Sequence, residues 1–420
     1  MYFISTRNQT TPRGLSAALA EGLAADDGLF IPQQMPTFSH SSFPAGLFYP
    51  EFANRLLSYF FKDDALAPSL IQFCNRAFNF PVPMKRLNSN TFVLELFHGP
   101  TSSFKDFGAH FLAECLSAIA DCRKTIMVAT SGDTGSAVAS AFYRKLNYRA
   151  VILYPNGQIS AKQEHQMTCW GENIFAFAVD GSFDQCQQLV KSAFRDPHWQ
   201  GPGLSSANSI NIGRLLPQIV YYAYSSMAFF RQYQEKPGFI IPSGNLGNAT
   251  AAYWAKAMGF PIRELVLTTN ANRVLVDYLR TEKYQARPSI ATLANAMDVG
   301  NPSNLERLEY LLGSFNDFKQ QVKAFSVKDK EIQNTIKRIY DEEAYICCPH
   351  TATAFYARQH LKEQPWIVVA TADPCKFDKV IEPIINAKVP LSPQLQRLLA
   401  KPTKIQPVEA NLNAIRALIE

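Results

Sequence analysis

From about Val93 onwards, short apolar runs alternate with segments in which apolar residues recur every three or four positions. The short runs predict buried strands, and the recurring segments predict amphipathic helices. Because the two kinds of segment alternate, the pattern favours a mostly parallel sheet covered by helices, the α/β class. The predicted strands are residues 92–97, 125–129, 150–154, 174–179, 239–241, 265–268 and 367–370.

The two ends of the chain follow a different pattern. Residues 43–61 and 64–78 predict helices, and the Phe-Pro-Val-Pro sequence at 80–83 is typical of an extended linker. Residues 401–407 predict a polar connector before a last helix at 411–418. We therefore divide the chain into a small N-terminal domain (1–90), a main α/β region of two subdomains (91–400) and a C-terminal connector with a helix (401–420).

Composition narrows the classes of protein. The chain has 420 residues, 47% of them hydrophobic and 18% charged, so it predicts a globular protein with a large core. The net charge of +6 is dispersed, which argues against nucleic acid, and Lys319 to Glu343 predicts a solvated helix face. Residues 215–230 are too short to span a bilayer and predict a core helix, so no membrane partner is expected.

Cysteine usage and the N-terminus indicate a compartment. The eight cysteines form no C-x-x-C pair, so neither a zinc site nor a disulfide framework is expected. The first residues lack the basic and then apolar order of a signal peptide. We expect a cytoplasmic protein in a reducing environment.

Lys105 occupies an unusual place for a lysine. The sequence from His98 to Gly108 joins a predicted strand to a predicted helix, and Lys105 begins that helix. Cations are disfavoured at the positive end of a helix unless an anion or a carbonyl cofactor is near. On position alone, a functional lysine and a surface lysine are about equally plausible.

Two further loops have the same strand, loop, helix arrangement. Residues 130–135 (Thr-Ser-Gly-Asp-Thr-Gly) predict either an anion site or an ordinary N-cap. Residues 242–248 (Pro-Ser-Gly-Asn-Leu-Gly-Asn) predict a phosphate cradle with Asn248 capping the next helix, or a simple glycine-rich turn. The loop at 242–248 is neither a Walker A loop nor G-x-G-x-x-G, so nucleotide binding is not supported.

A third polar cluster places Asn211 and Arg214 one helical turn apart. Arg214 is suited to bidentate phosphate binding, although an N-capped helix with a partly buried salt bridge is the more frequent explanation of such a cluster. His98, His198 and His350 lie in loop-like settings without metal-ligand spacing, so no metal is expected.

One lysine and several anion loops on a βα scaffold suggest pyridoxal phosphate. The lysine supplies an amine for a Schiff base, and a helix N-terminus supplies a site for the cofactor phosphate. The additional anion loops then indicate a substrate that is itself phosphorylated.

Taken in order, these motifs resemble the threonine synthase family. The resemblance includes residues 5–7 and 22–30, the loops 98–108, 131–135, 208–211 and 244–248, and Asn-Ala-Met-Asp at 295–298. It implies fold type II of the pyridoxal-phosphate enzymes, the fold of the tryptophan synthase β chain. That fold has two open parallel α/β domains, to which this family adds a small N-terminal domain.

The resemblance also implies roles for individual residues. Lys105 is the catalytic residue that bonds the cofactor, and Thr371 faces the pyridine nitrogen. The cofactor phosphate is bound by Gly244, Asn245, Leu246, Gly247 and Asn248. The substrate's carboxylate and phosphate are held by Ser131, Gly132, Asp133, Thr134, Asn208, Ser209, Asn211 and Arg214.

Three positions depart from the family pattern: Leu246 stands for Phe, Asp27 for a second Gly and Asp373 for His. An inward-pointing Asp373 would favour a protonated pyridine ring.

The reaction implied is conversion of O-phospho-L-homoserine and water to L-threonine and phosphate, by a monomer or homodimer. Alternatives are a phospholyase that releases 2-oxobutyrate, and a non-catalytic binding protein. As a base near neutrality, Lys105 needs its pKa lowered by about two to three units, for which Phe97, Phe104 and Phe107 are the expected apolar neighbours.

Overall fold

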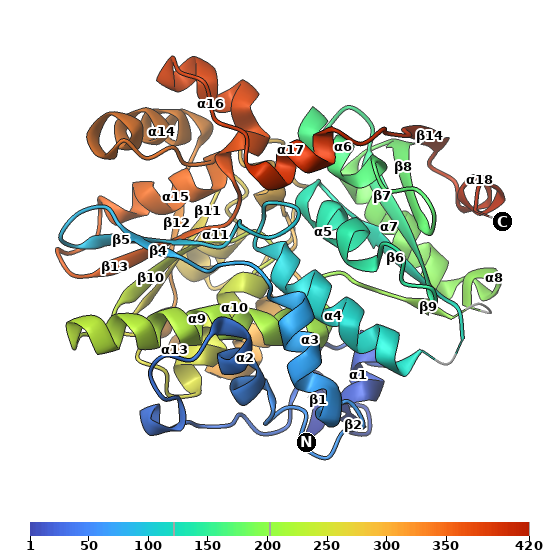
Figure 1. Cartoon of the computed structure of the whole chain (residues 1–420), viewed down its shortest axis with the longest axis horizontal. Coiled ribbons are helices and arrows are strands. Elements are labelled where there is room, and N and C mark those ends of the chain that lie inside the picture. The colour runs from blue at the N-terminus through green and yellow to red at the C-terminus, as the bar shows by residue number, and fades with distance from the viewer. Residues whose placement is uncertain (121, 201–202, 420) are drawn as a thin grey trace.

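Two sheets face one another across the middle of the molecule, and the N-terminal region packs beneath them (Figure 1). The computed structural model describes residues 1–120, 122–200 and 203–419. The larger sheet has the strand order β12-β11-β10-β13-β5-β4, in which only the β4–β5 pair is antiparallel. Its strands are β4 (Met84–Arg86), β5 (Thr91–Glu95), β10 (Gly238–Pro242), β11 (Leu265–Thr269), β12 (Lys323–Ser326) and β13 (Trp366–Ala370).

The smaller sheet is parallel throughout, in the order β14-β8-β7-β6-β9. Its strands are β6 (Lys124–Ala129), β7 (Tyr148–Pro155), β8 (Ile174–Asp180), β9 (Leu204–Ser205) and β14 (Gln406–Glu409). All seven predicted strands are confirmed. The connector at 401–407 was wrong in part, because its end forms β14 and pairs with β8; a four-residue edge strand with a proline has little strand signal of its own.

The N-terminal region combines a small antiparallel sheet with three helices. The sheet contains β1 (Tyr2–Ser5), β2 (Arg13–Gly14) and β3 (Phe30–Pro32). The helices are α1 (Leu15–Glu21), α2 (Tyr49–Leu57) and α3 (Leu70–Ala77). The predicted helices at 43–61 and 64–78 were too long, because Pro44, Gly46 and Pro68 delay the helix starts.

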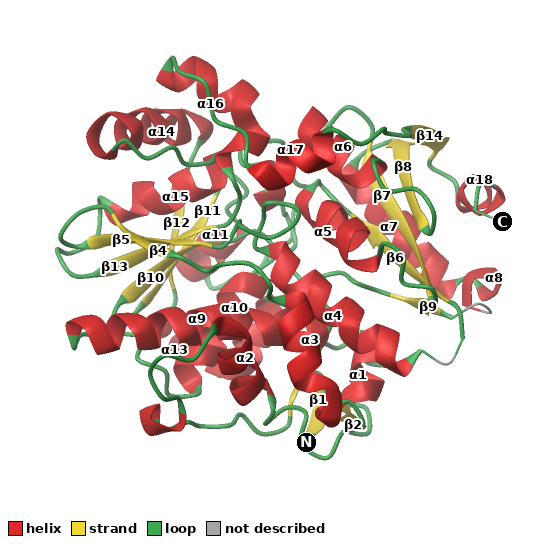
Figure 2. Cartoon of the chain, in the orientation of Figure 1, coloured by secondary structure: helices red, strands yellow, loops and turns green. Residues whose placement is uncertain are grey.

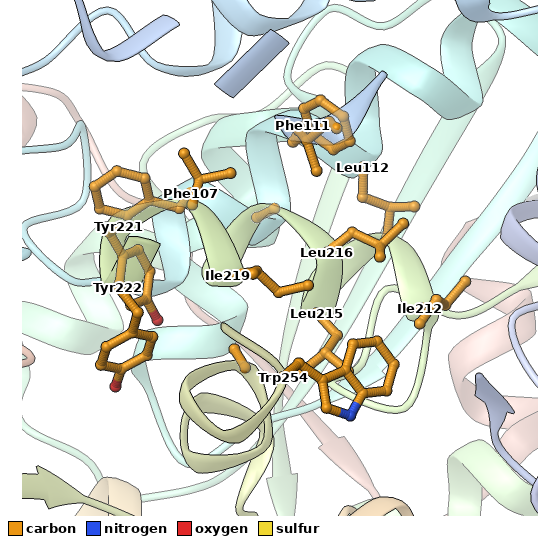
Figure 3. Close-up of a cluster of buried hydrophobic side chains, with 14 of the residues drawn as sticks. Phe107, Phe111, Leu112, Ile212, Leu215, Leu216, Ile219, Tyr221, Tyr222 and Trp254 are labelled. Atoms are coloured by element: carbon orange, nitrogen blue, oxygen red, sulfur yellow. The ribbon is translucent and has the colours of Figure 1, made fainter. Parts of the chain in front are cut away.

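Three helices form the centre of the main core. Helix α9 (Ile212–Tyr233) is buried over most of its length, and α4 (Lys105–Ile119) and α10 (Gly247–Ala257) pack against it. Figure 3 shows Phe111 and Leu112 of α4 on one side of α9 and Trp254 of α10 on its other side, beside Leu215. The core helix at 215–230 is thus confirmed, and no helix in the described part of the chain is long and apolar enough to cross a membrane.

The remaining helices cover the two sheets (Figure 2). Helix α14 presents Ile332, Ile336 and Ile339 to the core and its charged side to solvent. The solvated face expected for 319–343 therefore applies to α14, whereas β12 interrupts the earlier part. The helices are α5 (Asp133–Phe142), α6 (Ala161–Thr168), α7 (Phe183–Arg195), α8 (Pro197–Gln200), α11 (Val274–Thr281), α12 (Leu305–Leu312), α13 (Phe315–Gln321), α14 (Asp329–Glu343), α15 (Pro349–Arg358), α16 (Asp378–Ile385), α17 (Pro393–Leu399) and α18 (Leu412–Ala417), and short 3-10 turns lie at His40–Ser42, Ala67–Ser69, Asn295–Met297 and Pro374–Phe377.

Loops from both sheets meet where the sheets face one another. The loop after β5 receives hydrogen bonds from both sides: the Thr101 carbonyl accepts from Gln166 of α6 and from Lys376 after β13, each at 3.0 Å. Ligands of open α/β sheets bind at such carboxyl ends of strands. The predicted motifs lie on these loops, so the fold brings together segments far apart in sequence.

Candidate active site

Lys105 is the first residue of α4. It follows the loop after β5, in the region where the loops of the two sheets meet, which we call the seam. The loop before it is fixed to the end of β13, because the Phe104 N–H donates to the Thr371 carbonyl at 2.9 Å and Ser103 forms a bridge with Ala372. Lys105 is partly exposed, unlike its buried neighbours Ser103 and Asp106. A lysine that begins a helix is thus held at the mouth of the seam.

Burial lowers the pKa of Lys105 to about 8, against an opposing effect of Asp133. Arg214 and Lys376 lower it further by repulsion between like charges. The expected lowering is confirmed. Its expected apolar cause is correct in part, since the Lys105 Nζ lies 5.9 Å from the centroid of the Phe104 ring, whereas Phe107 packs in the core against Tyr221.

A buried ion pair joins the two sides of the site. The Nζ of Lys376, after β13, lies 2.6 Å from Oδ1 of Asp133, at the start of α5. Gln163 of α6 donates to the same oxygen at 2.9 Å. Burial alone would raise the pKa of Asp133, but Lys376, Lys105 and then His350 outweigh it and hold that pKa well below its usual range. Asp133 therefore carries a negative charge that is already paired.

The loop at 130–135 is built around the Thr130 hydroxyl, which accepts from the N–H groups of Gly132 and Gly135. Gly132 has φ 131°, and a Cβ there would lie 2.6 Å from the Gln163 side chain. The N-cap residue of α5 is Gly132, so no Ser or Asp caps this helix, although the Thr130 hydroxyl accepts from one N–H of its first turn. The absence of an ordinary cap favours the anion site. Ser131 and Thr134 keep partial exposure beside it.

The loop at 244–248 forms a second helix start without a side-chain cap. Leu246 has φ 59°, and Gly244 lies so close to residues 296–297 that a Cβ would be 2.9 Å from the Met297 Cα. Asn245 donates to the Ser209 hydroxyl at 2.6 Å, which joins this loop to the third cluster. Gly247 opens α10, so the backbone at the helix N-terminus suits a phosphate.

The prediction that Asn248 caps the following helix was wrong. Asn248 lies inside the first turn of α10, and its Oδ1 accepts from the hydroxyls of Tyr221 and Tyr222 at 2.5 and 2.8 Å. Its Nδ2 is buried and has no partner among the described residues. This amide therefore keeps an unused donor.

The cluster at 208–214 divides into scaffold and candidate binding groups. Asn211 caps α9 by accepting from the Gly213 N–H, and its Nδ2 donates to the carbonyls of Leu19 and Ser206, which confirms the N-cap interpretation. Its amide is thus committed to the fold. Asn208 and Ser209 keep partial exposure.

Arg214 is buried, and its Nη1 donates to the Ala207 carbonyl. Burial lowers the pKa of Arg214 to about 10, partly opposed by Asp106. Its Nε has no partner, and no carboxylate within ion-pair distance is found for it in the described ranges, so the expected salt bridge is absent there. A buried guanidinium of this kind favours an anionic ligand.

The end of β13 places Thr371 and Asp373. Thr371 is buried behind Lys105, beside the bridge to Ser103. The Asp373 carboxylate accepts from the Cys375 N–H at 2.9 Å and caps the turn that carries Lys376. Asp373 therefore serves as a local cap through one of its carboxylate oxygens.

The donor and acceptor set fits pyridoxal phosphate. On the loops and helices that form the site, six buried polar atoms have no partner in the described ranges: Ser103 Oγ, Gln166 Oε1, Arg214 Nε, Asn248 Nδ2, Asn295 Oδ1 and His350 Nδ1. Such atoms are costly unless a ligand or water satisfies them. They accompany the Lys105 amine and the starts of α5 and α10, whose N-cap residues carry no capping side chain. An amine and a helix N-terminus are the groups that a phosphorylated aldehyde requires. No group of three or more metal-ligating side chains occurs among the described residues.

Sequence reasoning missed three side chains of the site. Lys376 and Gln163 reach Asp133 from distant segments, and His350 lies in helix α15 although a loop was expected. For Lys376, the sequence signal was its place between Cys375 and Phe377, two residues that are often buried. A buried lysine is almost always paired, so this position could have indicated an ion pair.

Comparison with known families covers nearly the whole chain. The pyridoxal-phosphate dependent enzyme family matches residues 77–372. The threonine synthase N terminus matches residues 2–78, and the C-terminal region of threonine synthase matches residues 349–419. These matches contain all three parts of the fold.

Individual relatives match over similar lengths. Threonine synthase of Haemophilus influenzae is 38% identical over 411 residues, 96% of each chain. Threonine synthase of Escherichia coli is 37% identical over 426 residues, covering 100% of this chain and 99% of the relative.

Solved structures agree. The crystal structure of Escherichia coli threonine synthase aligns with a TM-score of 0.91 at 36% identity, over 100% of this chain and 99% of that one. The structure of Brucella melitensis threonine synthase with bound pyridoxal phosphate gives a TM-score of 0.93 at 32% identity, over 100% and 98%.

Proposed function

The chain belongs to the threonine synthase family of pyridoxal-phosphate-dependent enzymes, and we propose that it converts O-phospho-L-homoserine and water to L-threonine and phosphate. This reaction is the last step of threonine biosynthesis. The observation that carries the proposal is Lys105, an amine of lowered pKa at the start of α4, in a fold that also provides two glycine-containing loops whose helices begin without a side-chain cap at the N-cap residue.

The cofactor is assigned to the side of the site that contains α10. The backbone of Gly244, Asn245, Leu246, Gly247 and Asn248 would hold its phosphate, and the free Nδ2 of Asn248 adds a donor. We assign the Thr371 hydroxyl to the pyridine nitrogen, while the Asp373 carboxylate accepts from the Cys375 N–H. With the substrate joined to it in place of Lys105, pyridoxal phosphate would supply an electron sink that makes the substrate's Cα proton acidic.

Lys105 is the proton-transfer residue. With its Nζ released, Lys105 would remove the Cα proton of the substrate and then transfer protons at Cβ and Cγ as phosphate leaves from Cγ. A pKa near 8 allows a useful fraction of neutral amine at physiological pH. Water then adds at Cβ to give threonine.

The substrate's anionic groups are assigned to the other loops. Ser131, Gly132 and Thr134 at the start of α5 suit the carboxylate. Asn208, Ser209 and Arg214 suit the phosphate, with Arg214 supplying the buried charge. In this arrangement Asp133 and Asn211 support the binding residues rather than contact the substrate. Asp133 is paired with Lys376, and Asn211 caps the start of α9.

Product analysis tests the proposal. The purified protein, loaded with pyridoxal phosphate, is incubated with O-phospho-L-homoserine, and threonine, 2-oxobutyrate and phosphate are quantified. We expect threonine and phosphate in equal amounts. Release of 2-oxobutyrate with phosphate would identify a phospholyase instead, and a colourless protein without turnover would indicate a binding protein.

A further inference from the structure

Helix α15 points its N-terminus towards the site and carries a buried histidine there. His350 is its second residue and is 2% exposed. The first turn is capped by Cys348, whose Sγ accepts from the Thr351 N–H at 3.5 Å. The His350 ring packs edge-on against Phe377, the neighbour of Lys376, with ring centroids 5.0 Å apart.

One hydrogen bond determines the tautomer of His350. The backbone N–H of Ala296 donates to its Nε2 at 3.1 Å, so Nε2 carries no proton. Burial lowers the pKa of His350 to about 4, so the ring is neutral at physiological pH and its proton lies on Nδ1. That Nδ1–H is buried and has no acceptor in the part of the chain that the structure describes.

The charges around His350 favour an anionic acceptor. Lys105 and Lys376 both act on its titration, and Asp133, the acid among these groups, is already paired with Lys376. The positive end of α15 adds a partial charge of the same sign. A buried N–H without an acceptor is unfavourable, and a ligand oxygen at this position would relieve that cost.

We propose that His350 is a substrate-binding residue whose Nδ1–H, in the positive potential at the N-terminus of α15, donates to an oxygen of the substrate's phosphate. The proposal rests on the function proposed above and deepens it, because it adds a neutral donor to Asn208, Ser209 and Arg214, the groups assigned to this phosphate.

The cofactor phosphate is the other phosphate in the site, and the structure argues against it. Its cradle begins at Gly244, and the Ala296–Met297 backbone packs directly against that glycine. Since Ala296 also contacts His350 through its N–H, this backbone lies between the cradle and the imidazole. His350 is thus one layer removed from the cofactor phosphate.

Two substitutions separate the nitrogens of the imidazole. In His350→Gln, the side-chain Oε1 can still accept from the Ala296 N–H, but the donor at the Nδ1 position is lost. In His350→Asn, the amide nitrogen takes the Nδ1 position, but the acceptor for Ala296 is lost. The two variants with cofactor bound are compared for the KM of O-phospho-L-homoserine and for inhibition by inorganic phosphate. The Kd of pyridoxal phosphate is measured on the cofactor-free form of each variant.

We expect His350→Gln to raise both the KM and the phosphate inhibition constant about tenfold, and His350→Asn to change them less than about threefold. The Kd of pyridoxal phosphate should stay the same in both. Equal effects of the two variants, or a weaker cofactor with unchanged phosphate inhibition, would overturn the proposal.

A measurement on the wild-type protein is independent of variant folding. In protein labelled with ¹⁵N-histidine, inorganic phosphate should shift the Nδ1 signal of His350, assigned by its loss in His350→Asn. An unchanged Nδ1 signal at saturating phosphate would contradict the proposal. Failure of the proposed function would look different, as a phosphate-induced shift in a protein that forms no threonine.

Discussion

The ammonium of Lys376 and the carboxylate of Asp133 meet at 2.6 Å across the seam between the two sheets. The pair is fully buried, and Lys376 also donates to the Thr101 carbonyl at 3.0 Å. Because Asp133 is the acid that would otherwise stabilise the charged form of Lys105, its pairing with Lys376 helps to keep the pKa of Lys105 low.

Replacing Lys376 with methionine should therefore raise the pKa of Lys105. The substitution removes a repelling cation and frees Asp133 to attract the Lys105 ammonium, so both effects have the same sign. Since the neutral amine captures the cofactor, uptake of pyridoxal phosphate by the cofactor-free Lys376→Met protein should be about fivefold slower at pH 7. The difference should disappear above about pH 10, which stopped-flow absorbance across pH would show.

Asp133→Asn provides the opposite control. It removes the attracting anion, so the pKa of Lys105 should fall and the pH dependence of uptake should move to lower pH. The same direction of change in both variants would show that the pair does not act on Lys105 through charge. Circular dichroism checks folding, because an unpaired buried lysine costs about 3–5 kcal/mol.

Lys105→Ala should abolish the visible absorption of bound cofactor and reduce phosphate release by at least about a thousandfold, because the chain then lacks its covalent anchor and its base. Lys191→Ala, on the exposed side of α7, is the matched control and should leave both unchanged. Retained absorption and phosphate release in Lys105→Ala would refute the central assignment.

Thr371 tests the contact with the pyridine nitrogen. Thr371→Val keeps the shape and removes the hydroxyl, so the Kd of pyridoxal phosphate should rise about five- to thirtyfold, whereas Thr371→Ser should stay within about threefold. Fluorescence titration of the cofactor-free protein measures both. A valine variant that binds as tightly as the serine variant would remove Thr371 from the cofactor site.

Gly108 is required by the approach of α4 to Arg214. A Cβ at Gly108 would lie 2.7 Å from the Arg214 carbonyl oxygen, so Gly108→Ala should lower the free energy of unfolding by about 1–3 kcal/mol. At Gly14 the nearest atom would be 4.0 Å away, and Gly14→Ala should change stability by less than about 0.5 kcal/mol. Urea unfolding at equal cofactor loading compares them, and equal losses would contradict the packing argument.

The sequence allowed seven strands of the two main sheets and the binding loops to be predicted, because each depends on local pattern. Residues 130–135 show the reason: a buried strand, a glycine and a helix start follow one another directly in the chain. Asp27, which replaces the family's glycine, adopts φ 61°, a conformation that Asp tolerates better than most residues. Local conformation is thus readable even where the residue differs.

The contacts across the seam were not predictable in this way. Lys376 and Asp133 are 243 positions apart in the chain. The tautomer of His350 is determined by a hydrogen bond from the Ala296 N–H, which is also distant in sequence. Such contacts depend on how two sheets pack, which no spacing in one sequence encodes. Asn211 is a second example. The sequence left open whether it binds substrate or caps a helix, and the contacts of its Nδ2 with the carbonyls of Leu19 and Ser206 show that its side chain is used within the fold.

Strand β14 has a consequence for handling and expressing the protein. It pairs with the outer edge of β8, a strand of mostly apolar residues. Without β14, the backbone N–H and C=O groups of β8 would be free to pair with other chains. Strand β14 thus protects the edge of β8 from pairing with other chains. A shortened gene product that ends before Gln406 should retain the chemical groups of the site and yet accumulate as insoluble material.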